Sequence, residues 1–355
     1  MKPGHIGGAA VSRPSHGRVR TLSIVQVGGG FWGRGWAEIV HRTSGFRLAA
    51  LADGSSAVRR WATTELGVPA FPRLERTLDE VEADAVLLVS PPQTHRPLAE
   101  LALTRGLHVL SEKPLTLELE DARALAAMAE RTGLNVMVTQ NYRFRRQPQA
   151  LRALVSAGTL GRLHGIRIVC RRDLRNSFIS PRGWRAEMAH PYLFEMAIHH
   201  VDLLRMITGR EVAQVDALAW AVPDSPFQLE PNVRALLVLD DGTPVAYEGD
   251  FAAPGGETSW NGEWELVGAR ARAAWGGEVN APLRGSVHLE RYGSPRERVA
   301  LPRLPALDRV GVLHELRRAI AEGTTTECSV ADNIHSLAAV LGLARSVETR
   351  SPVRP

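Results

Sequence analysis

Lysine is almost absent from this sequence of 355 residues, in which only two of the 43 lysine and arginine residues are lysine. Lys2 lies near the start, and Lys113 follows an apolar run in Glu112-Lys113-Pro114. Arginine stays protonated at physiological pH, whereas a partly buried lysine can lose its proton and act as a general acid or base. Lys113 is therefore a candidate for acid–base chemistry, although a surface ion pair explains a lone lysine equally well.

Cysteine is scarce too, and long apolar runs are missing. Cys170 and Cys328 are far apart and show no metal-binding or redox spacing, so a reducing, cytoplasmic environment is expected. Residues 1–20 hold no apolar segment of signal-peptide length and no twin arginine, and no later segment is long and apolar enough to cross a membrane. We predict a disordered tail over 1–20 and no membrane partner.

The positive charge is spread along the chain. The formal net charge is +5, but the arginines occur singly or in small groups, as at Arg143, Arg145 and Arg146. Such groups suit a solvated surface or a small anionic ligand. A nucleic-acid partner is not predicted, because no dense basic run is present.

Two domains are expected, because the chain exceeds the length of one typical domain. Five apolar runs alternate with helix-like segments, which predicts an α/β fold with a Rossmann domain, a doubly wound parallel sheet, over 21–145. The runs are 22–27, 46–52, 85–89, 108–110 and 135–138. Ligands gather beyond the carboxyl ends of such strands, where the glycine-rich, Glu-Lys-Pro and Gln-Asn motifs lie.

After about residue 145 the pattern changes. Segments of alternating polarity, such as 235–239 and 264–267, predict a second, α+β domain over 146–355 with a large open, mostly antiparallel sheet. Helices are expected over 312–321 and 330–347. The second of these could pack against the Rossmann domain.

A dinucleotide-binding turn is predicted after the first apolar run. Gly28, Gly30 and Gly33 satisfy G-x-G-x-x-G, with Phe31 and Trp32 between the last two glycines. The pattern permits a tight turn, close approach of the backbone to a pyrophosphate and close helix packing. The helix that follows would point its N-terminus at the phosphates.

A carboxylate follows this turn at the distance expected for ribose recognition. Asp53 ends the second apolar run, where it would accept hydrogen bonds from the adenosine ribose hydroxyls. It would also repel a 2′-phosphate, so NAD is favoured over NADP. Arg59 and Arg60 keep NADP open, although an exposed helix face explains them better.

A second candidate site lies on an amphipathic segment that ends at Gly209. Helical spacings of four and three place Glu195, His199 and Asp202 on one face. His199 would exchange a proton with a hydroxyl there, oriented by a carboxylate one turn away. A helix start with packed or solvated histidines explains the pattern as well. No metal is predicted, because no further ligand cluster is present, and His200 is expected to be structural.

Taken together, these motifs resemble the glucose–fructose oxidoreductase/inositol dehydrogenase (Gfo/Idh/MocA) family, in order and in spacing, over nearly the whole chain after the tail. The motifs are the glycine-rich turn, Asp53, Ser90-Pro91-Pro92-Gln93-Thr94-His95, Glu112-Lys113-Pro114, Gln140-Asn141-Tyr142-Arg143-Phe144, Gly183-Trp184-Arg185 and residues 195–202. The resemblance implies a second domain whose open sheet forms the floor of the substrate site and an oligomer interface. A homodimer or homotetramer is therefore expected.

The resemblance also implies roles for three side chains. Lys113 corresponds to the family's catalytic lysine, and His199 to the histidine that contacts the reacting hydroxyl. The family's catalytic aspartate falls on Glu195, which is one methylene longer. Either this carboxylate reaches the same point, or its role passes to Lys113 and His199.

The predicted cofactor is NAD, with NADP less favoured. Besides the glycine-rich turn and Asp53, the residues expected to bind it are Ser90, Pro91, His95, Glu112, Lys113 and Asn141. The candidates on the substrate side are Lys113, Tyr142, Arg143, Trp184, Arg185, Glu195 and His199. Ordinary packing and surface charge explain Tyr142 and Arg143 equally well.

The predicted activity is hydride transfer between nicotinamide and a secondary alcohol of a sugar, sugar derivative or cyclitol. This describes an NAD(P)-dependent dehydrogenase acting on CH–OH groups. One alternative is an epimerase or glycoside-cleaving enzyme that oxidises its sugar transiently and keeps NAD tightly bound. Others are a reductase of a non-carbohydrate carbonyl or imine, and a non-catalytic NAD-binding sensor. Lys113 and His199 argue against the sensor, because a sensor needs neither.

Overall fold

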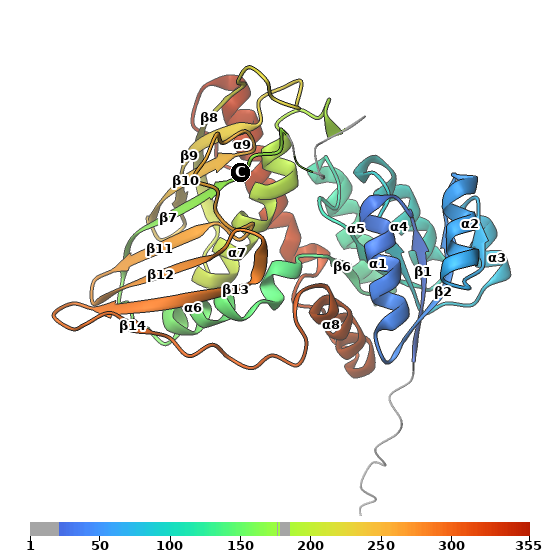
Figure 1. Ribbon diagram of the computed structural model, residues 1–355. Coiled ribbons are helices and arrows are strands. Elements are labelled where there is room, and N and C mark those ends of the chain that lie inside the picture. The colour runs from blue at the N-terminus through green and yellow to red at the C-terminus, as the bar shows by residue number, and fades with distance from the viewer. Residues whose placement is uncertain (1–20, 176, 178–184) are drawn as a thin grey trace, which may run out of the picture.

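The computed structural model describes residues 21–175, 177 and 185–355. It contains a six-stranded sheet in the first part of the chain and an eight-stranded sheet in the rest (Figure 1). The predicted fold class, a Rossmann domain followed by a domain with a large, mostly antiparallel sheet, is confirmed. The tail predicted over 1–20 lies outside the described residues.

The Rossmann sheet has the strand order β3-β2-β1-β4-β5-β6, and all its pairs are parallel. Each predicted apolar run forms a strand, because a parallel strand covered on both faces must be apolar throughout. The strands are β1 (Leu22–Val27), β2 (Phe46–Ala52), β3 (Ala70–Phe71), β4 (Ala85–Leu88), β5 (His108–Ser111) and β6 (Val136–Val138). Only the two-residue β3 was not anticipated, since it is too short to carry a pattern.

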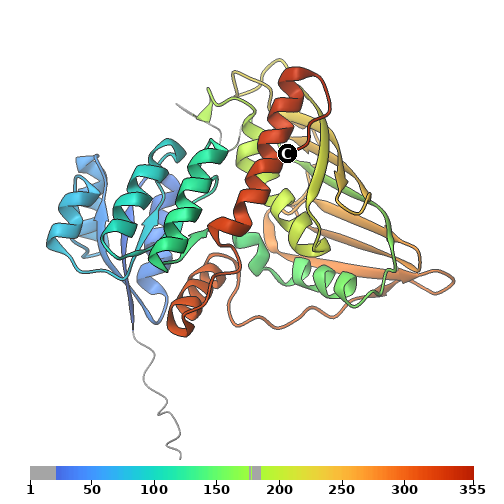
Figure 2. The same ribbon diagram turned by 180° about the vertical axis from the view of Figure 1, so that it is seen from behind.

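Helices cover both faces of this sheet, with α1 on one side and α4 and α5 on the other (Figures 1 and 2). The helices are α1 (Phe31–Arg42), α2 (Ser56–Glu65), α3 (Leu74–Glu80), α4 (His95–Thr104) and α5 (Leu119–Thr132). Two short 3₁₀ turns, η1 (Pro92–Thr94) and η2 (Asn141–Phe144), follow β4 and β6. The loops that carry the predicted cofactor residues therefore share the carboxyl edge of the sheet.

The second sheet has the order β14-β13-β12-β11-β7-β10-β9-β8, and only the pair β7–β10 is parallel. Its strands are β7 (Leu163–Arg171), β8 (Val212–Trp220), β9 (Asn232–Leu239), β10 (Pro244–Asp250), β11 (Glu263–Gly268), β12 (Ala271–Glu278), β13 (Ala281–Arg291) and β14 (Glu297–Arg298). In β10, Val245, Tyr247 and Gly249 are buried while the residues between them are more exposed. This alternation is typical of a sheet with one covered face.

Helices lie on the face of the second sheet that is turned toward the Rossmann domain (Figure 1). They are α6 (Arg146–Ser156), a π-helical turn η4 (Leu193–Ala197), α7 (Ile198–Thr208) and α9 (Val330–Thr349). Residues 198–207 of α7 are all buried, polar ones included. A helix enclosed on all sides must pair its polar groups within the protein.

The last two helices return to the Rossmann domain. In α8 (Asp308–Glu322), Val312, Leu313 and Leu316 pack with Trp36 and Phe46 on the α1 side of the first sheet. Helix α9 lies between α5 and the second sheet (Figure 2). The end of the chain therefore ties the two sheets together at the edge where the cofactor loops lie.

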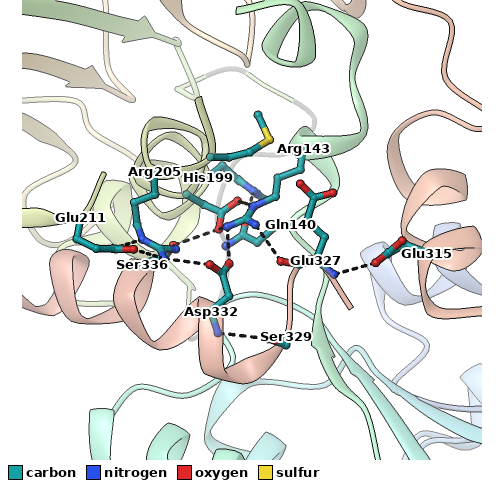
Figure 3. A network of polar contacts seen from close by, with 12 residues as sticks. Gln140, Arg143, His199, Arg205, Glu211, Glu315, Glu327, Ser329, Asp332 and Ser336 are labelled. Carbon is teal, nitrogen blue, oxygen red and sulfur yellow. Dashed lines mark hydrogen bonds and ion pairs between the residues drawn. The ribbon is translucent and has the colours of Figure 1, made fainter. Parts of the chain in front are cut away.

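A buried ion cluster fixes this junction (Figure 3). The guanidinium of Arg143 in η2 donates to both oxygens of Asp202 in α7, each at 2.6 Å, and to Oδ2 of Asp332 in α9 at 2.6 Å. It also donates to the Glu327 carbonyl oxygen at 3.0 Å. Arg205 of α7 donates to Oδ1 of Asp332 at 3.0 Å. The side chains of Arg143 and Asp202 are only 4% and 1% exposed, so each depends on the other for its charge partner.

We expect Asp202→Ala to lower the free energy of unfolding by about 3–5 kcal/mol, because it leaves a buried guanidinium without its main partner. Urea titration followed by circular dichroism measures this. Asp79→Ala is the matched control, because its pair with Arg105 is 58% and 43% exposed. The control should change the free energy by about 0–1 kcal/mol. Equal effects of the two variants would contradict the role given to the buried pair.

Candidate active site

The turn after β1 is built for close packing at two glycines and for open space at a third. Gly28 has a φ of +92°, and a Cβ there would lie 2.7 Å from the Val89 carbonyl oxygen. A Cβ at Gly33 would lie 2.4 Å from the Gly28 carbonyl oxygen. At Gly30, however, a Cβ would meet nothing within 4 Å. The protein itself therefore requires glycine at 28 and 33, whereas at 30 the free space suits the approach of a ligand.

The N-terminus of α1 is open to an anion. Its N-cap, Gly30, has no side chain to accept a hydrogen bond, and its first turn holds no carboxylate. The first N–H groups of a helix carry a partial positive charge and commonly hold phosphate. Phe31 and Trp32 stand at this end with 62% and 39% of their surface exposed, as expected for residues beside a cofactor.

Asp53 lies where the sequence predicts it, at the end of β2. Its Oδ2 accepts a hydrogen bond from the Gly29 N–H at 2.8 Å, and its Oδ1 accepts one from the Ser55 N–H at 2.7 Å. The carboxylate is thus held against the phosphate-binding turn itself. Arg59 donates to the carbonyl oxygens of Asp53 at 2.9 Å and of Gly54 at 2.8 Å, so this cation lies against the turn that follows β2.

The imidazole of His95, predicted to bind the cofactor, bonds to the backbone of the loops after β4 and β5. It is buried, with Nε2 at 2.8 Å from the Ser90 carbonyl oxygen and Nδ1 at 3.0 Å from that of Leu115. Burial lowers the pKa of His95. Both ring nitrogens face the protein backbone. The Ser90 hydroxyl lies 2.7 Å from that of Thr94.

Glu112 and Lys113 follow β5, and the Lys113–Pro114 peptide bond is cis. Oε1 of Glu112 accepts a hydrogen bond from Trp36 Nε1 at 2.6 Å, and its Oε2 accepts one from the Lys113 N–H at 3.1 Å. This holds the Glu-Lys-Pro turn against α1. The Lys113 side chain can then point away from the Rossmann domain.

Lys113 reaches the π-helical turn of the second domain. Its Nζ donates to the Glu195 carbonyl oxygen at 3.0 Å and lies 3.9 Å from the carboxylate Oε2. That Oε2 also accepts a hydrogen bond from Arg185 at 2.8 Å. Glu195 is therefore shared between two cations. Trp184, the neighbouring predicted contact, lies outside the described residues.

His199, four residues after Glu195, is buried, and its neighbours fix the orientation of its ring. Its Nδ1 lies 3.0 Å from Oε1 of Gln140, an oxygen that can accept a proton held by Nδ1. Its ring is stacked on that of Tyr142, with centroids 4.3 Å apart and an interplanar angle of 8°. Burial, with the nearby charges of Lys113 and Arg145, holds the pKa of His199 well below its usual value of 6.5. These surroundings favour the neutral imidazole.

The predicted grouping of residues 195, 199 and 202 forms only in part. Glu195 lies in the π-helical turn over Leu193–Ala197, and His199 and Asp202 both face residues 140–143. Asp202 belongs to the ion cluster with Arg143 and not to the site. His200, as expected, is structural, since it bonds to the Tyr247 hydroxyl at 2.8 Å.

Two predicted substrate contacts have other partners. The donors of Arg143 are taken up by the ion cluster described above. The ring of Tyr142 is stacked on His199, and the Arg145 guanidinium lies 3.4 Å from its centroid. Both side chains are buried, so neither offers a free surface to a substrate. Among the described candidates, Lys113, Arg185, Glu195 and His199 are the ones brought together.

Comparison with known proteins identifies the family. The model for the oxidoreductase family with an NAD-binding Rossmann fold, GFO_IDH_MocA, matches residues 22–140. The model for the GFO/IDH/MocA C-terminal domain matches residues 149–274. This chain belongs to the Gfo/Idh/MocA oxidoreductase family. Its first domain is therefore an NAD-binding Rossmann domain.

Relatives within the family cover most of the chain. The uncharacterized protein y4oX of Sinorhizobium fredii is 27% identical over 348 residues, 94% of this chain and 96% of that protein. A dTDP-3,4-didehydro-2,6-dideoxy-alpha-D-glucose 3-reductase of Streptomyces violaceoruber is 30% identical over 269 residues, 73% of each chain. An oxidoreductase from Agrobacterium radiobacter, crystallised with NAD+, L-tartaric acid and magnesium, shares the fold with a TM-score of 0.82 and 20% identity, covering 94% of this chain and 98% of that one.

Two residues of the site, Arg145 and Asp308, carry no recognisable signal in the sequence. Gln140 belongs to a family motif that gives it no role of its own, and Arg145 is part of a small basic group. Asp308, at the start of α8, accepts a hydrogen bond from Asn141 and an ion pair from Arg145. Asn141 and Asp308 are 167 positions apart, so no local pattern could join them.

Two further features bear on ligands and on membranes. Within residues 21–175, 177 and 185–355, no group of three or more histidine, cysteine, aspartate or glutamate side chains is arranged to hold a metal ion. No helix in that part of the chain has the length and apolar character needed to span a membrane.

We expect Gly30→Ala to weaken NAD binding about tenfold or more without loss of stability. The new methyl group meets no protein atom, but it takes up the space left for the ligand. Isothermal titration calorimetry with NAD measures the affinity, and thermal unfolding checks the fold. Gly276→Ala is the control, because that position in β12 is equally open and lies in the other sheet. Unchanged affinity in Gly30→Ala would remove this turn from the cofactor site.

Proposed function

We propose that this protein is an NAD-dependent oxidoreductase that moves hydride between nicotinamide and a secondary alcohol of a sugar, sugar derivative or cyclitol. The observation that carries the proposal is the meeting of Lys113, from the NAD-binding domain, with Glu195 and His199, from the second domain. Lys113 Nζ lies 3.0 Å from the Glu195 carbonyl oxygen, and a neutral His199 is buried one turn away. A CH–OH group that meets these residues would have both a proton acceptor and a cation at its oxygen.

The residues present fit a dinucleotide. Gly28 to Gly33 and the open N-terminus of α1 would hold the pyrophosphate, Asp53 the adenosine ribose, and Ser90, Glu112 and Asn141 the nicotinamide end. When bound, NAD accepts the hydride in oxidation and NADH returns it in reduction. NAD is favoured over NADP, because the fixed Asp53 carboxylate would repel a 2′-phosphate, and Arg59 already donates to two carbonyl oxygens beside it.

The proton has a defined route in this arrangement. In the oxidation, a bound NAD would take up the hydrogen of the alcohol's C–H bond together with both electrons of that bond. The hydroxyl proton passes to Nε2 of His199, the ring atom that holds a lone pair. Lys113 donates a hydrogen bond to the same oxygen and stabilises the negative charge that develops there. Glu195, held by Arg185, positions the lysine.

Sugar chemistry is the substrate class that the relatives favour, since the Streptomyces violaceoruber relative is named as a reductase at C3 of a nucleotide-linked deoxysugar. Arg185 lies beside Glu195 at the proposed substrate site, and its planar donors suit vicinal hydroxyl groups or an anionic substituent.

The test is a spectrophotometric screen of the purified protein against inositols, hexoses, pentoses and nucleotide-linked sugars, with NAD and NADP in parallel and in both directions. We expect turnover with NAD, and a loss of about 10²- to 10⁴-fold in kcat for Lys113→Met. Arg318→Met is the control, because that side chain is exposed and lies on α8 with partners of its own. NAD bound without any turnover or exchange would overturn the proposal and favour the sensor. A half-reaction on bound NAD without net release of NADH would instead favour transient oxidation.

We also propose that two copies of the chain associate through the outer face of the second sheet. Leu218 and Leu236 are 64% and 50% exposed on this face, which carries no helix among the described residues. Arg234 and Glu248 lie beside them, so the face presents both signs of charge. A face with mixed charge around an apolar centre can pair with itself about a two-fold axis.

Light scattering should therefore give a mass at least twice the 38.7 kDa of one chain. Leu236→Glu should reduce it to that of the single chain, because it places two carboxylates at the centre of the contact. Leu229→Glu, at a leucine that is 40% exposed in the connection before β9, should leave the mass unchanged. A wild-type protein of single-chain mass would refute this assignment.

A further inference from the structure

His199 is set in a small frame of side chains that do not themselves reach the substrate region. Gln140 accepts the Nδ1 proton at 3.0 Å. Tyr142 covers one face of the imidazole, in a parallel stack with centroids 4.3 Å apart. Arg145 lies 3.4 Å above the centroid of the Tyr142 ring. The resulting arrangement is guanidinium, phenol and imidazole, with an amide at the edge of the imidazole.

This frame is itself anchored to three parts of the chain. Arg145 bonds to the side chain of Asn261, which precedes β11, and pairs with Asp308 of α8 at 3.0 Å. Gln140 lies close to Arg143, whose guanidinium is fixed by the ion cluster (Figure 3), and Tyr142 directly precedes Arg143 in the chain. None of these groups is free to follow the imidazole if it turns. The ring is therefore held in one orientation before any substrate arrives.

The charges around His199 are mainly positive. Lys113 approaches from the β5 loop and Arg145 from the end of η2, whereas His200, its neighbour on α7, is neutral near pH 7 because burial lowers its pKa to about 4. Glu195, the carboxylate nearest in sequence, is engaged by Lys113 and Arg185. Asp202 is neutralised by Arg143. Among the residues that the structure describes, no carboxylate is therefore in place to stabilise an imidazolium, and a proton on Nδ1 leaves Nε2 as the acceptor.

We propose that Gln140, Tyr142 and Arg145 are positioning residues that hold His199 as a neutral imidazole with its proton on Nδ1 and its lone pair on Nε2, ready to receive the substrate proton. An amide at position 140 is essential to this, because a carboxylate there would stabilise the charged ring. The stacked phenol fixes the plane of the ring, and the guanidinium behind it adds a positive charge without touching the imidazole. The inference rests on the proposed function for its consequence in catalysis, but not for the state of the histidine.

The state of His199 is measured first, in the full-length protein labelled with ¹⁵N and without substrate. His199 is assigned by the signal that is lost in His199→Gln. We expect the Nδ1–H tautomer at pH 7 and no protonation down to well below pH 6.5. In Gln140→Glu the midpoint should rise by about one pH unit or more, because a carboxylate now faces Nδ1. A wild-type ring that is protonated on Nε2, or that titrates near 6.5, would overturn the inference even if the protein has no dehydrogenase activity.

Gln214→Glu is the matched control, since it makes the same change of charge on β8, away from the imidazole. Its His199 should titrate as in the wild type. Equal shifts in the two variants would mean that net charge, and not the contact with Nδ1, sets the titration.

The consequence for turnover is measured next as the pH dependence of kcat/KM for oxidation. The acid limb should move upward in Gln140→Glu as the midpoint does, because oxidation requires the neutral ring. Tyr142→Leu should lower kcat about tenfold with little change in KM, since it frees the ring without removing a substrate contact. Tyr142→Phe keeps the stack and should behave as the wild type. An unchanged kcat in Tyr142→Leu would show that the stack does not position the base.

Discussion

The geometry of this molecule depends on the need to neutralise one buried guanidinium. Arg143 follows the last strand of the Rossmann sheet, and its side chain is removed from water. A charge in such a place is tolerated only when its partners surround it. Here the partners come from two other elements, Asp202 of α7 and Asp332 of α9. The ion cluster therefore determines where these helices meet the carboxyl edge of the first sheet.

The arrangement of the site follows from this junction. His199 precedes Asp202 on α7 by three residues, and Gln140 precedes Arg143 by three residues. The ion pair between Asp202 and Arg143 therefore also brings His199 and Gln140 together. Gln140 then accepts the Nδ1 proton of His199. The same docking places the Glu195 carbonyl oxygen within 3.0 Å of Lys113 Nζ. The candidate site takes residues from both domains, and the buried ion cluster, which lies outside that site, aligns the two domains.

Lys113 and His199 have different electrostatic surroundings within the site. Lys113 donates to a carbonyl oxygen and lies near a carboxylate, whereas His199 is buried beside Lys113 and Arg145, surroundings that lower its pKa and favour the neutral ring. Helix α8, near the C-terminal end of the chain, also holds residues of this region in place, because its Asp308 bonds to both Arg145 and Asn141.

The sequence by itself determined the features that have local causes. Apolar runs specify the buried parallel strands, glycine at position 33 avoids a clash with the Gly28 carbonyl oxygen of the same turn, and Asp53 accepts a hydrogen bond from the Ser55 N–H two positions further on. The tertiary structure decided which polar residues face a ligand and which face the protein. Arg143 and His95 resemble ligand-binding residues in sequence, but their partners are a carboxylate cluster and backbone carbonyl groups. A residue type states which hydrogen bonds a side chain can make, and only the packing of distant segments determines which ones it does make.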